Sequence, residues 1–322
     1  MAQASEGKEL FGKVVTVLGG SGFFGRHLAQ ELLARGARLR IASRNPQRAY
    51  KLKPLGNLGQ VQLVRCDVTR PETLSAALAG SDAVVNLVGA FSGDLDALQG
   101  TGAGRVAQAA KEAGVQAFVH VSAIGADADS PVDYARTKAE GEEAVRKAFS
   151  KATIIRPSLL FGPDDNFVMM FAGLISNFPV LPVFGPDAKL QPVFVDDVAA
   201  GIANVLVDPK GLGGKIYEVA GPEVTTMLEL NEGIAAAQGR HRSFVALPDG
   251  ISSAFATLTG WLPGAPITSD QFALLKAGSV ASGKRPGLKA LGVAARPLGL
   301  FLDRWMVRFR KHGRFGEQAA SR

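Results

Sequence analysis

The sequence is poor in the residues that build disulfide-bonded, metal-binding and membrane-spanning proteins. Its 322 residues include a single cysteine, Cys66, so no internal disulfide can form, as is typical of a reducing compartment. The longest stretch without charge, 166–186, contains Pro179 and Pro182 and predicts a buried helix and turn, not a transmembrane segment. No metal site is expected, because the histidines lack the spacing of metal ligands: His27, His120, His241 and His312.

Charge is distributed unevenly along the chain. The formal net charge is +7, yet 276–322 alone has eleven Lys or Arg against Asp303 and Glu317, so the remaining residues sum to −2. The first ten residues are polar and lead directly into a strand pattern, which predicts no signal or transit peptide and a cytoplasmic-type protein. All of the excess positive charge therefore lies in the C-terminal segment.

A glycine-rich turn connects the first strand pattern to the first helix pattern. The apolar run 14–18 precedes Gly19, Gly22 and Gly25, spaced G-x-x-G-x-x-G, and a helical pattern follows. Glycines allow a tight turn and close backbone approach, and the free N–H groups at a helix start attract a phosphate. This context predicts a dinucleotide site that also includes the residues between the glycines: Ser21, Phe23 and Phe24.

The first half of the chain alternates strand and helix patterns. Strands are expected at 13–18, 38–43, 61–66, 82–88, 116–122 and 152–156, with helices at 23–35, 71–79, 95–113 and 132–149. The alternation predicts an α/β fold, a Rossmann-type doubly wound parallel sheet with a smaller C-terminal substrate-side lobe. We expect an N-terminal extension (1–11), a dinucleotide-binding domain (12–160), a mixed remainder (161–275) and a basic docking segment (276–322).

The residues after the second and third strands predict which nucleotide is preferred. An acidic residue usually holds the ribose 2′-hydroxyl about 20 residues past the glycines. Here Ser43 and Arg44 occupy that place, so the site favours the 2′-phosphate of NADP(H), with NAD(H) less favoured, unless Arg44 is a solvated surface residue. Asp67 and Val68 follow the third strand, where the carboxylate can accept from adenine or cap the next helix.

Two further segments supply candidates on the nicotinamide side. The fourth strand ends in small residues that let the backbone approach the cofactor: Asn86, Leu87, Val88 and Gly89. Ser122 closes the fifth strand, and Tyr134 and Lys138 share one helix face at i and i+4. The lysine charge favours the phenolate, and the serine can polarise a carbonyl. The alternative is a surface helical pair.

These motifs resemble extended or atypical short-chain dehydrogenases/reductases over residues 12 to 240. The resemblance rests on the glycine fingerprint, on Ser122, Tyr134 and Lys138, and on Arg156-Pro157-Ser158 after the sixth strand. The runs 155–167 and 191–198 most resemble the bacterial form of the nucleotide-binding accessory subunit of respiratory complex I. The likeness continues through 286–293 and Pro297-Leu298, where ordinary reductases share nothing.

This resemblance implies tight NADPH binding at the peripheral arm near the membrane, without established turnover. The positions that match on the cofactor side are Gly19, Gly22, Gly25, Arg44, Asp67, Ser122, Tyr134 and Lys138. Pro157, directly after the sixth strand, is a further candidate for contact with the cofactor. The triad residue types are intact, so Tyr134 and Lys138 either catalyse or bind the nicotinamide ribose. Other subunits of the peripheral arm are the implied partners, on the cytoplasmic face of the bacterial inner membrane.

The C-terminal segment predicts a basic amphipathic helix. With Pro297 as its first residue, one face carries apolar side chains and the arginines lie around it: Leu298, Phe301, Leu302, Trp305 and Phe309. Such a helix suits an anionic membrane surface or an acidic partner groove, unless it packs on its own core. Nucleic acid is not expected, because the cations lie at one terminus without a recognition motif.

Three functions remain open from the sequence. The first is a non-turnover NADP(H)-binding subunit of a respiratory NADH:quinone oxidoreductase, in which the nucleotide stabilises the fold by mass action. The second is an active NADP-dependent reductase or epimerase with Tyr134 as general acid/base, Lys138 as its electrostatic partner and Ser122 as hydrogen-bond donor. The third is a sensor that reports the redox state of the nucleotide by binding.

Overall fold

A computed structural model describes residues 9–248, 250, 269–311 and 313, and these form two compact units. Unit 1 comprises Met1–Pro157, Val195–Val219 and Ser282–Ala294. Unit 2 comprises Ser158–Phe194, Ala220–Ala281 and Ala295–Arg322. The residues of 276–322 are therefore divided between the two units. Each unit is described separately below.

Unit 1 is organised around a seven-stranded sheet in which every strand pair is parallel. In spatial order the strands are β11 (Ile216–Val219), β6 (Thr153–Pro157), β5 (Ala117–Val121), β4 (Ala83–Asn86), β1 (Val14–Leu18), β2 (Arg38–Ser43) and β3 (Val61–Arg65). This is the dinucleotide-binding order with one added strand, so the predicted Rossmann architecture is confirmed. The order reverses between β1 and β4, where such sheets bind ligands.

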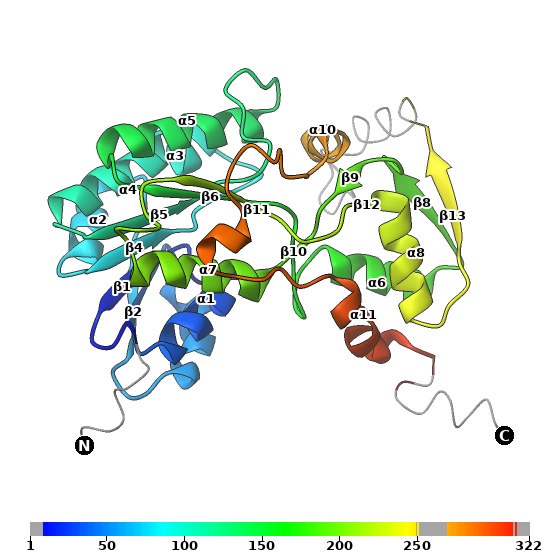
Figure 1. Ribbon diagram of the computed structural model, residues 1–322, viewed down its shortest axis with the longest axis horizontal. Helices are drawn as coiled ribbons and strands as arrows, with labels where there is room; N and C mark the ends of the chain where they lie inside the picture. The colour runs from blue at the N-terminus through cyan, green and yellow to red at the C-terminus, as the bar shows by residue number, and fades with distance from the viewer. Residues whose placement is uncertain (1–8, 249, 251–268, 312, 314–322) are drawn as a thin grey trace. The chain divides into compact units, whose positions relative to one another are not determined.

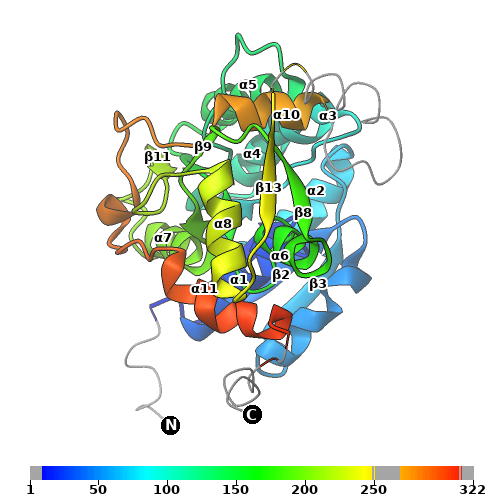
Figure 2. The ribbon, with the colours of Figure 1, turned by 90° about the vertical axis from the view of Figure 1, so that its right-hand side faces the viewer.

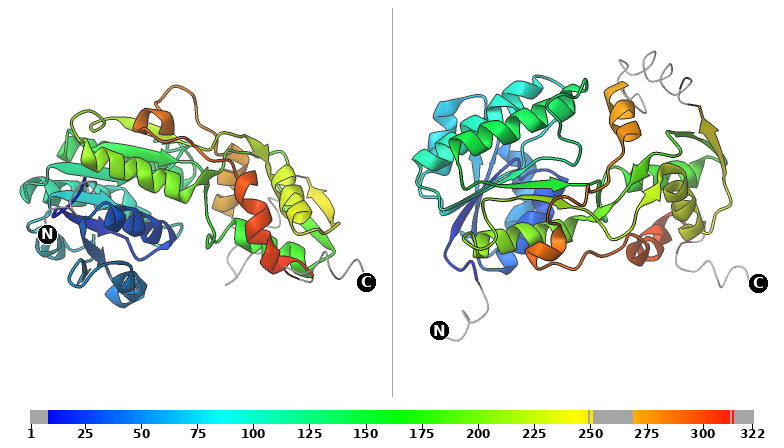
Figure 3. Two further views of the ribbon diagram at one scale, coloured as in Figure 1. Left: turned by 60° about the horizontal axis from the view of Figure 1, so that its bottom comes forward. Right: turned by 45° about the horizontal axis from the view of Figure 1, so that its top comes forward.

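Helices cover both faces of this sheet. One face carries α2 (Pro71–Leu78), α3 (Leu95–Gln99), α4 (Thr101–Glu112) and α5 (Asp133–Ala148), and the other carries α1 (Phe23–Ala34) and α7 (Val195–Val207), as Figure 1 shows. Helices α1 and α7 lie side by side, which Figure 3 also shows. Two 3₁₀ segments complete the unit, η1 (Pro46–Leu55) and η2 (Leu288–Leu291). The central strands are buried on both faces, because β1, β4 and β5 are almost continuously apolar.

The helix expected at 95–113 is instead two helices, α3 and α4, separated at Gly100. The Asp96 carboxylate accepts from the backbone N–H of Thr101 at 2.9 Å, and so caps α4 before α3 can continue into it. A Cβ on Gly100 would lie 2.3 Å from Asp96 Oδ1, so a larger residue there would displace this carboxylate. The apolar periodicity alone does not reveal this break.

Unit 2 combines four helices of the described residues with three two-stranded sheets, seen from the side in Figure 2. The helices are α6 (Val168–Asn177), α8 (Met227–Ala237), α10 (Ser269–Ala277) and α11 (Gly299–Met306), followed by η3 (Val307–Phe309). The strand pairs are β7 (Leu160–Phe161) with β10 (Val193–Phe194), β8 (Val180–Phe184) with β13 (Ser243–Leu247), and β9 (Lys189–Leu190) with β12 (Thr225–Thr226). None of the helices in the described residues has the length and apolar content needed to cross a bilayer.

The apolar side of α11 packs inside unit 2. Phe301 stacks on Phe194 with ring centroids 4.2 Å apart and on Trp305 at 4.9 Å, and Phe161 contacts both aromatic rings of α11. Helix α11 begins at Gly299, two residues after the expected start at Pro297. The face predicted to meet a membrane or a partner groove is therefore used by the protein's own core, while Arg304 and Lys311 remain exposed.

Candidate functional site

The glycine turn between β1 and α1 leaves the start of the helix without a side-chain cap. The N-cap residue is Gly22, no side chain bonds the first N–H groups, and the first turn contains no acidic residue. Backbone N–H groups at a helix start need partners. The α1 N-terminus can therefore accept an anion without displacing any cap.

Each of two glycines in this turn permits a close approach that a side chain would prevent. Gly19 has φ +74°, and a Cβ there would lie 3.2 Å from the backbone of Leu87 and Val88 at the end of β4. A Cβ on Gly25 would lie 2.4 Å from the carbonyl oxygen of Gly20. The glycines thus bring the start of α1 against the ends of β1 and β4, at the point where the strand order reverses.

The remaining residues of the fingerprint lie at this turn with different exposure. Ser21, Phe23 and Phe24 are half-buried, Gly22 is exposed, and the Phe23 ring meets His27 edge-on at 5.1 Å. His27 is buried, and its Nδ1 lies 2.5 Å from Asp196 of α7. This contact fixes the first turns of α1 to the neighbouring helix.

The structure brings Arg44 and Asp67 together at the carboxyl ends of β2 and β3. Hydrogen bonds from the backbone and hydroxyl of Thr69 hold the pKa of Asp67 below its usual value, with a smaller contribution from the charge of Arg44. Asp67 closes its own turn and does not cap α2, whose N-cap residue is Arg70. Val68 is buried in the apolar core beside α2, so its side chain faces away from solvent.

Two serine hydroxyls at the strand ends are buried and have no hydrogen-bond partner among the described residues: Ser43 Oγ after β2 and Ser122 Oγ after β5. Buried hydroxyls without partners are costly, and each calls for an explanation. Together with the uncapped start of α1 and the exposed Arg44 guanidinium, they form a set of donors at one edge of one sheet. That set fits a phosphate-bearing dinucleotide with hydroxylated sugars.

The loop after β4 is held by buried side chains beneath it. Asn86 Oδ1 accepts from the N–H of Val88, and Asn86 Nδ2 donates to Nδ1 of His120 on β5. Gln99 Oε1 accepts from the N–H of Ala90, and its amide donates to Thr137. The Asn86 side chain is thus used inside the protein, and the backbone of Leu87, Val88 and Gly89 faces the glycine turn.

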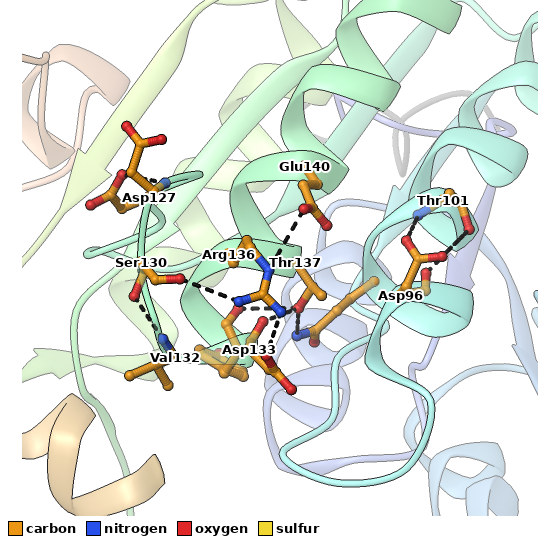
Figure 4. A network of polar contacts seen from close by, with 12 residues as sticks. Asp96, Thr101, Asp127, Ser130, Val132, Asp133, Arg136, Thr137 and Glu140 are labelled. Carbon is orange, nitrogen blue, oxygen red and sulfur yellow. Dashed lines mark hydrogen bonds and ion pairs between the residues drawn. The ribbon is translucent and has the colours of Figure 1, made fainter.

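A second network fixes the first turn of α5, which carries Tyr134 (Figure 4). Arg136 pairs with Asp133 and Glu140 on α5 and donates to the carbonyl oxygen of Ser130. Thr137 donates to the carbonyl oxygen of Asp133 at 2.6 Å. The helix start therefore has a fixed position relative to the loop that precedes it.

Tyr134 and Lys138 lie together, as their spacing predicts. Lys138 Nζ is 5.9 Å from the centre of the Tyr134 ring and donates to the carbonyl oxygen of Val121 at 3.2 Å. Burial lowers the pKa of Lys138 to about 8, opposed by the charge of Glu142, and burial raises the pKa of Tyr134 to about 12. At neutral pH Tyr134 is therefore a phenol that can donate a hydrogen bond, and Lys138 remains mainly cationic.

Phe91 is a neighbour of this pair that the sequence interpretation missed. Its ring is largely exposed and stacks on the ring of Tyr134 at 4.5 Å with an angle of 14°. Gly89 lies close to this pair, since a Cβ there would be 3.0 Å from Lys138 Nζ. The sequence interpretation also missed three other residues of this region: Gln99, Thr137 and Glu142. Of these, Glu142 follows Lys138 by four residues on the same helix face. Pro157, the last cofactor-side candidate, is buried at the end of β6 and accepts from Ile124.

His120 should make the fold sensitive to acid. Burial lowers its pKa to about 3 from 6.5, with a further contribution from Lys138, so the folded state excludes a proton that the unfolded chain binds. The associated stability is present above pH 6.5 and is lost as the pH falls toward 3, by about 1.4 kcal/mol per pH unit. Urea unfolding at pH 7 and pH 5 measures this loss, which His120→Gln should reduce and exposed His241→Gln should not.

Cys66 is poorly suited to act as a nucleophile or as a metal ligand. Cys66 is buried next to β3, and burial raises the pKa of its thiol, so the thiolate is disfavoured. The described residues contain no group of three or more His, Cys, Asp or Glu side chains that could hold a metal ion.

Comparison with known proteins gives matches over most of the chain. A family described as NAD(P)H-binding matches residues 19–173. The chain is 34% identical over 299 residues to "NADH dehydrogenase (ubiquinone) 1 alpha subcomplex subunit 9, mitochondrial" of Rattus norvegicus, which covers 90% of this chain and 78% of the relative. The Dictyostelium discoideum protein of the same name is 37% identical over 222 residues. That match covers 67% of this chain and 61% of the relative, less than two thirds of its length.

A reductase is also among the relatives. The "Ceramide reductase" of Caulobacter vibrioides is 30% identical over 253 residues, covering 77% of this chain and 78% of that protein. Among solved structures, the triphenylmethane reductase of Citrobacter sp. complexed with NADP(H) matches with a TM-score of 0.72 and 21% identity, over 90% of this chain and 99% of the other. At that identity the match shows the fold alone.

Proposed function

The chain belongs to the family of subunit 9 of the mitochondrial NADH dehydrogenase alpha subcomplex, and from this premise we propose that it is an NADP(H)-binding accessory subunit of a respiratory NADH:quinone oxidoreductase. The observation that carries the proposal is the similarity to that subunit over 90% of the chain, well beyond the nucleotide-binding region. The bound nucleotide is mainly structural and is not turned over.

The nucleotide is held by the glycine turn and the strand ends of unit 1. The N–H groups at the start of α1 bind the pyrophosphate, while Ser122, Tyr134 and Lys138 bind the nicotinamide ribose. When bound, such a nucleotide can supply a hydride. Tyr134, with a pKa of about 12 and Phe91 stacked on its ring, supports a positioning role, because a phenol in this state is a poor base at neutral pH.

Arg44 selects NADP(H) over NAD(H) in this proposal. Arg44→Ser should weaken NADPH binding about 10- to 100-fold, since it removes a charged hydrogen-bond donor from the 2′-phosphate, and should leave NADH binding nearly unchanged. Fluorescence titration with both nucleotides measures the two affinities. Arg38→Ser, at the opposite end of β2, is the matched control. Equal weakening for NADPH and NADH would contradict the assignment.

Attachment to the peripheral arm, near the cytoplasmic face of the bacterial inner membrane, is assigned to the basic segment 276–322. Because Phe301 and Trp305 pack inside unit 2, the contact is ionic and uses exposed cations such as Arg304 and Lys311 toward acidic groups. Nucleic acid is not a proposed partner.

The test is purification of the tagged full chain from solubilised membranes of the cell that produces it. We expect it to bring down subunits of the NADH:quinone oxidoreductase and to retain NADP(H) through gel filtration. Tyr134→Phe should leave assembly with these subunits intact. A chain found alone in the soluble fraction would overturn the proposal.

An active NADPH-dependent reductase is the second candidate. It is favoured by the intact Ser122, Tyr134 and Lys138, by the unpartnered hydroxyl of Ser122 and by the similarity to the ceramide reductase. In that case the purified chain should oxidise NADPH with a carbonyl substrate, and Tyr134→Phe should abolish the activity. The two functions thus predict different results for Tyr134→Phe: intact assembly for the accessory subunit and loss of activity for the reductase.

A further inference from the structure

A second concentration of positive charge lies in unit 1, apart from the C-terminal segment. No Asp or Glu occurs between Glu31 and Asp67. The same interval contains eight basic residues: Arg35, Arg38, Arg40, Arg44, Arg48, Lys51, Lys53 and Arg65. The net charge of the residues outside 276–322 is nevertheless negative, because acidic residues elsewhere outnumber these cations.

Six of these cations, among them Arg38, Lys51 and Lys53, are exposed and form no ion pair in the part of the chain that the structure describes. Lys53 lies 5.3 Å above the ring of Tyr50. By contrast, Arg35 pairs with carboxylates and Arg40 donates to the carbonyl oxygens of Ala77 and Ala79. Arg38, Lys51 and Lys53 are therefore available to an external anion.

Large apolar side chains are exposed beside these cations. Tyr50 is 56% exposed, Leu55 is 42% exposed and Leu58 is fully exposed. Leu58 is the second residue of a turn closed by the N–H of Gln60 donating to the carbonyl oxygen of Asn57, with Gly59 at φ +77°. The turn requires glycine at the third position but does not require leucine at the second. Folding therefore gives no reason for a leucine at this tip.

Three of these side chains line one hollow, and Lys51, Leu55 and Leu58 are exposed neighbours of its lining residues in the chain. A hollow of about 560 Å³ is lined by Arg38, Tyr50 and Lys53 together with Gly59 and Gln60 of the turn. It lies between η1, the turn and the beginnings of β2 and β3. We call Arg38, Tyr50, Lys51, Lys53, Leu55 and Leu58 the η1 surface.

We propose that the η1 surface binds an anionic lipid bilayer, with Arg38, Lys51 and Lys53 on phosphate headgroups and Leu55 and Leu58 entering the interface. This contact goes beyond the proposed function and does not depend on the nucleotide or on segment 276–322. Basic residues near an anionic leaflet are attracted to it, and an exposed aliphatic residue gains free energy when it leaves water.

The composition of the surface favours lipid over a protein partner. Lysine is depleted from protein interfaces, where arginine and aromatic residues dominate, whereas Lys with Tyr and Leu is typical of membrane-surface segments. Two of the three cations of the η1 surface are lysines on flexible stems, and Leu58 lies at the tip of a turn. A bilayer accepts such groups without requiring fixed partner geometry.

Flotation with lipid vesicles tests the proposal on the full chain. Binding is expected to vesicles of phosphatidylcholine with about a third phosphatidylglycerol, to be absent with phosphatidylcholine alone, and to weaken as salt is raised. Lys51→Glu with Lys53→Glu should reduce the partition coefficient on the order of 30-fold or more, given the attraction per basic residue. Leu58→Ser should reduce it roughly tenfold through lost apolar transfer.

The matched control is Lys111→Glu with Lys147→Glu, which makes the same change of net charge on α4 and α5. Arg304→Glu probes the C-terminal segment in the same assay. Full binding by these controls, together with loss by the η1 variants, supports the proposal. Equal losses in all charge variants, no binding to anionic vesicles, or binding of a polyglutamate peptide or DNA in their place would overturn it. Copurification with the respiratory complex can succeed or fail independently of this result.

Discussion

Gly25→Ala is expected to abolish nucleotide binding and to lower the free energy of unfolding by about 3 kcal/mol. The new Cβ would lie 2.4 Å from the carbonyl oxygen of Gly20 and 2.5 Å from its carbonyl carbon and Cα. These are backbone atoms, which cannot rotate away as a side chain can, so α1 must shift from the glycine turn. Urea unfolding measures the stability, and titration with NADPH measures the site.

Gly22→Ala provides the matched control in the same turn. A Cβ at Gly22 would meet only the carbonyl oxygen of Gly19, at 3.8 Å, and the backbone there has φ −81°. This variant should therefore unfold at nearly the same urea concentration as the parent protein. If Gly25→Ala is as stable as Gly22→Ala and still binds NADPH, then neither folding nor nucleotide binding depends on the close approach of α1 to the turn.

Glu142→Gln is expected to destabilise the fold by about 3 kcal/mol or more. Arg156 donates to both carboxylate oxygens of Glu142 at 2.8 Å, and the Glu142 side chain is only 5% exposed. Removing one partner of a buried pair leaves the other charge without compensation, which typically costs about 3–5 kcal/mol. Glu218, 3.7 Å from Arg156, would retain part of the interaction, so the lower end of that range applies.

Two comparisons make the Glu142 result interpretable. Glu140→Gln, in the exposed pair with Arg136, should change stability by less than about 1 kcal/mol. Replacing Glu142 and Arg156 together by methionine should recover part of the loss, because the buried guanidinium is removed with its main partner. Glu218 then loses its cation but still accepts hydrogen bonds from Ser282. Glu142→Gln should also lower the pKa of Lys138 further below 8, measurable by NMR titration. An unchanged pKa of Lys138 would show that the charge of Glu142 does not affect the protonation of Lys138.

The sequence pattern was sufficient for the sheet and for the parts of the site that depend on local spacing. Alternating strand and helix patterns determine the layers, and the glycines have a local steric role next to β1 and α1. Tyr134 and Lys138 meet because residues four apart share a helix face. These inferences need no knowledge of distant contacts.

The parts that could not be predicted depend on which distant residues meet. Gln99 contacts Thr137 across 38 positions, and nothing in either segment indicates the partner. The apolar face of α11 has the same periodicity whether it meets lipid or Phe194, so only the tertiary packing decides. The hydrogen bond between Asn86 and His120 joins two strands, and neither segment indicates the partner in the sequence.

The division of the chain has a consequence for how the protein is made. The polypeptide passes between the two units five times, and unit 1 is complete only with Ser282–Ala294. During synthesis the edge of β6 stays unpaired while residues 158–215, the segment between β6 and β11, are translated. A chain that terminates within this segment would keep an open sheet edge, which favours aggregation.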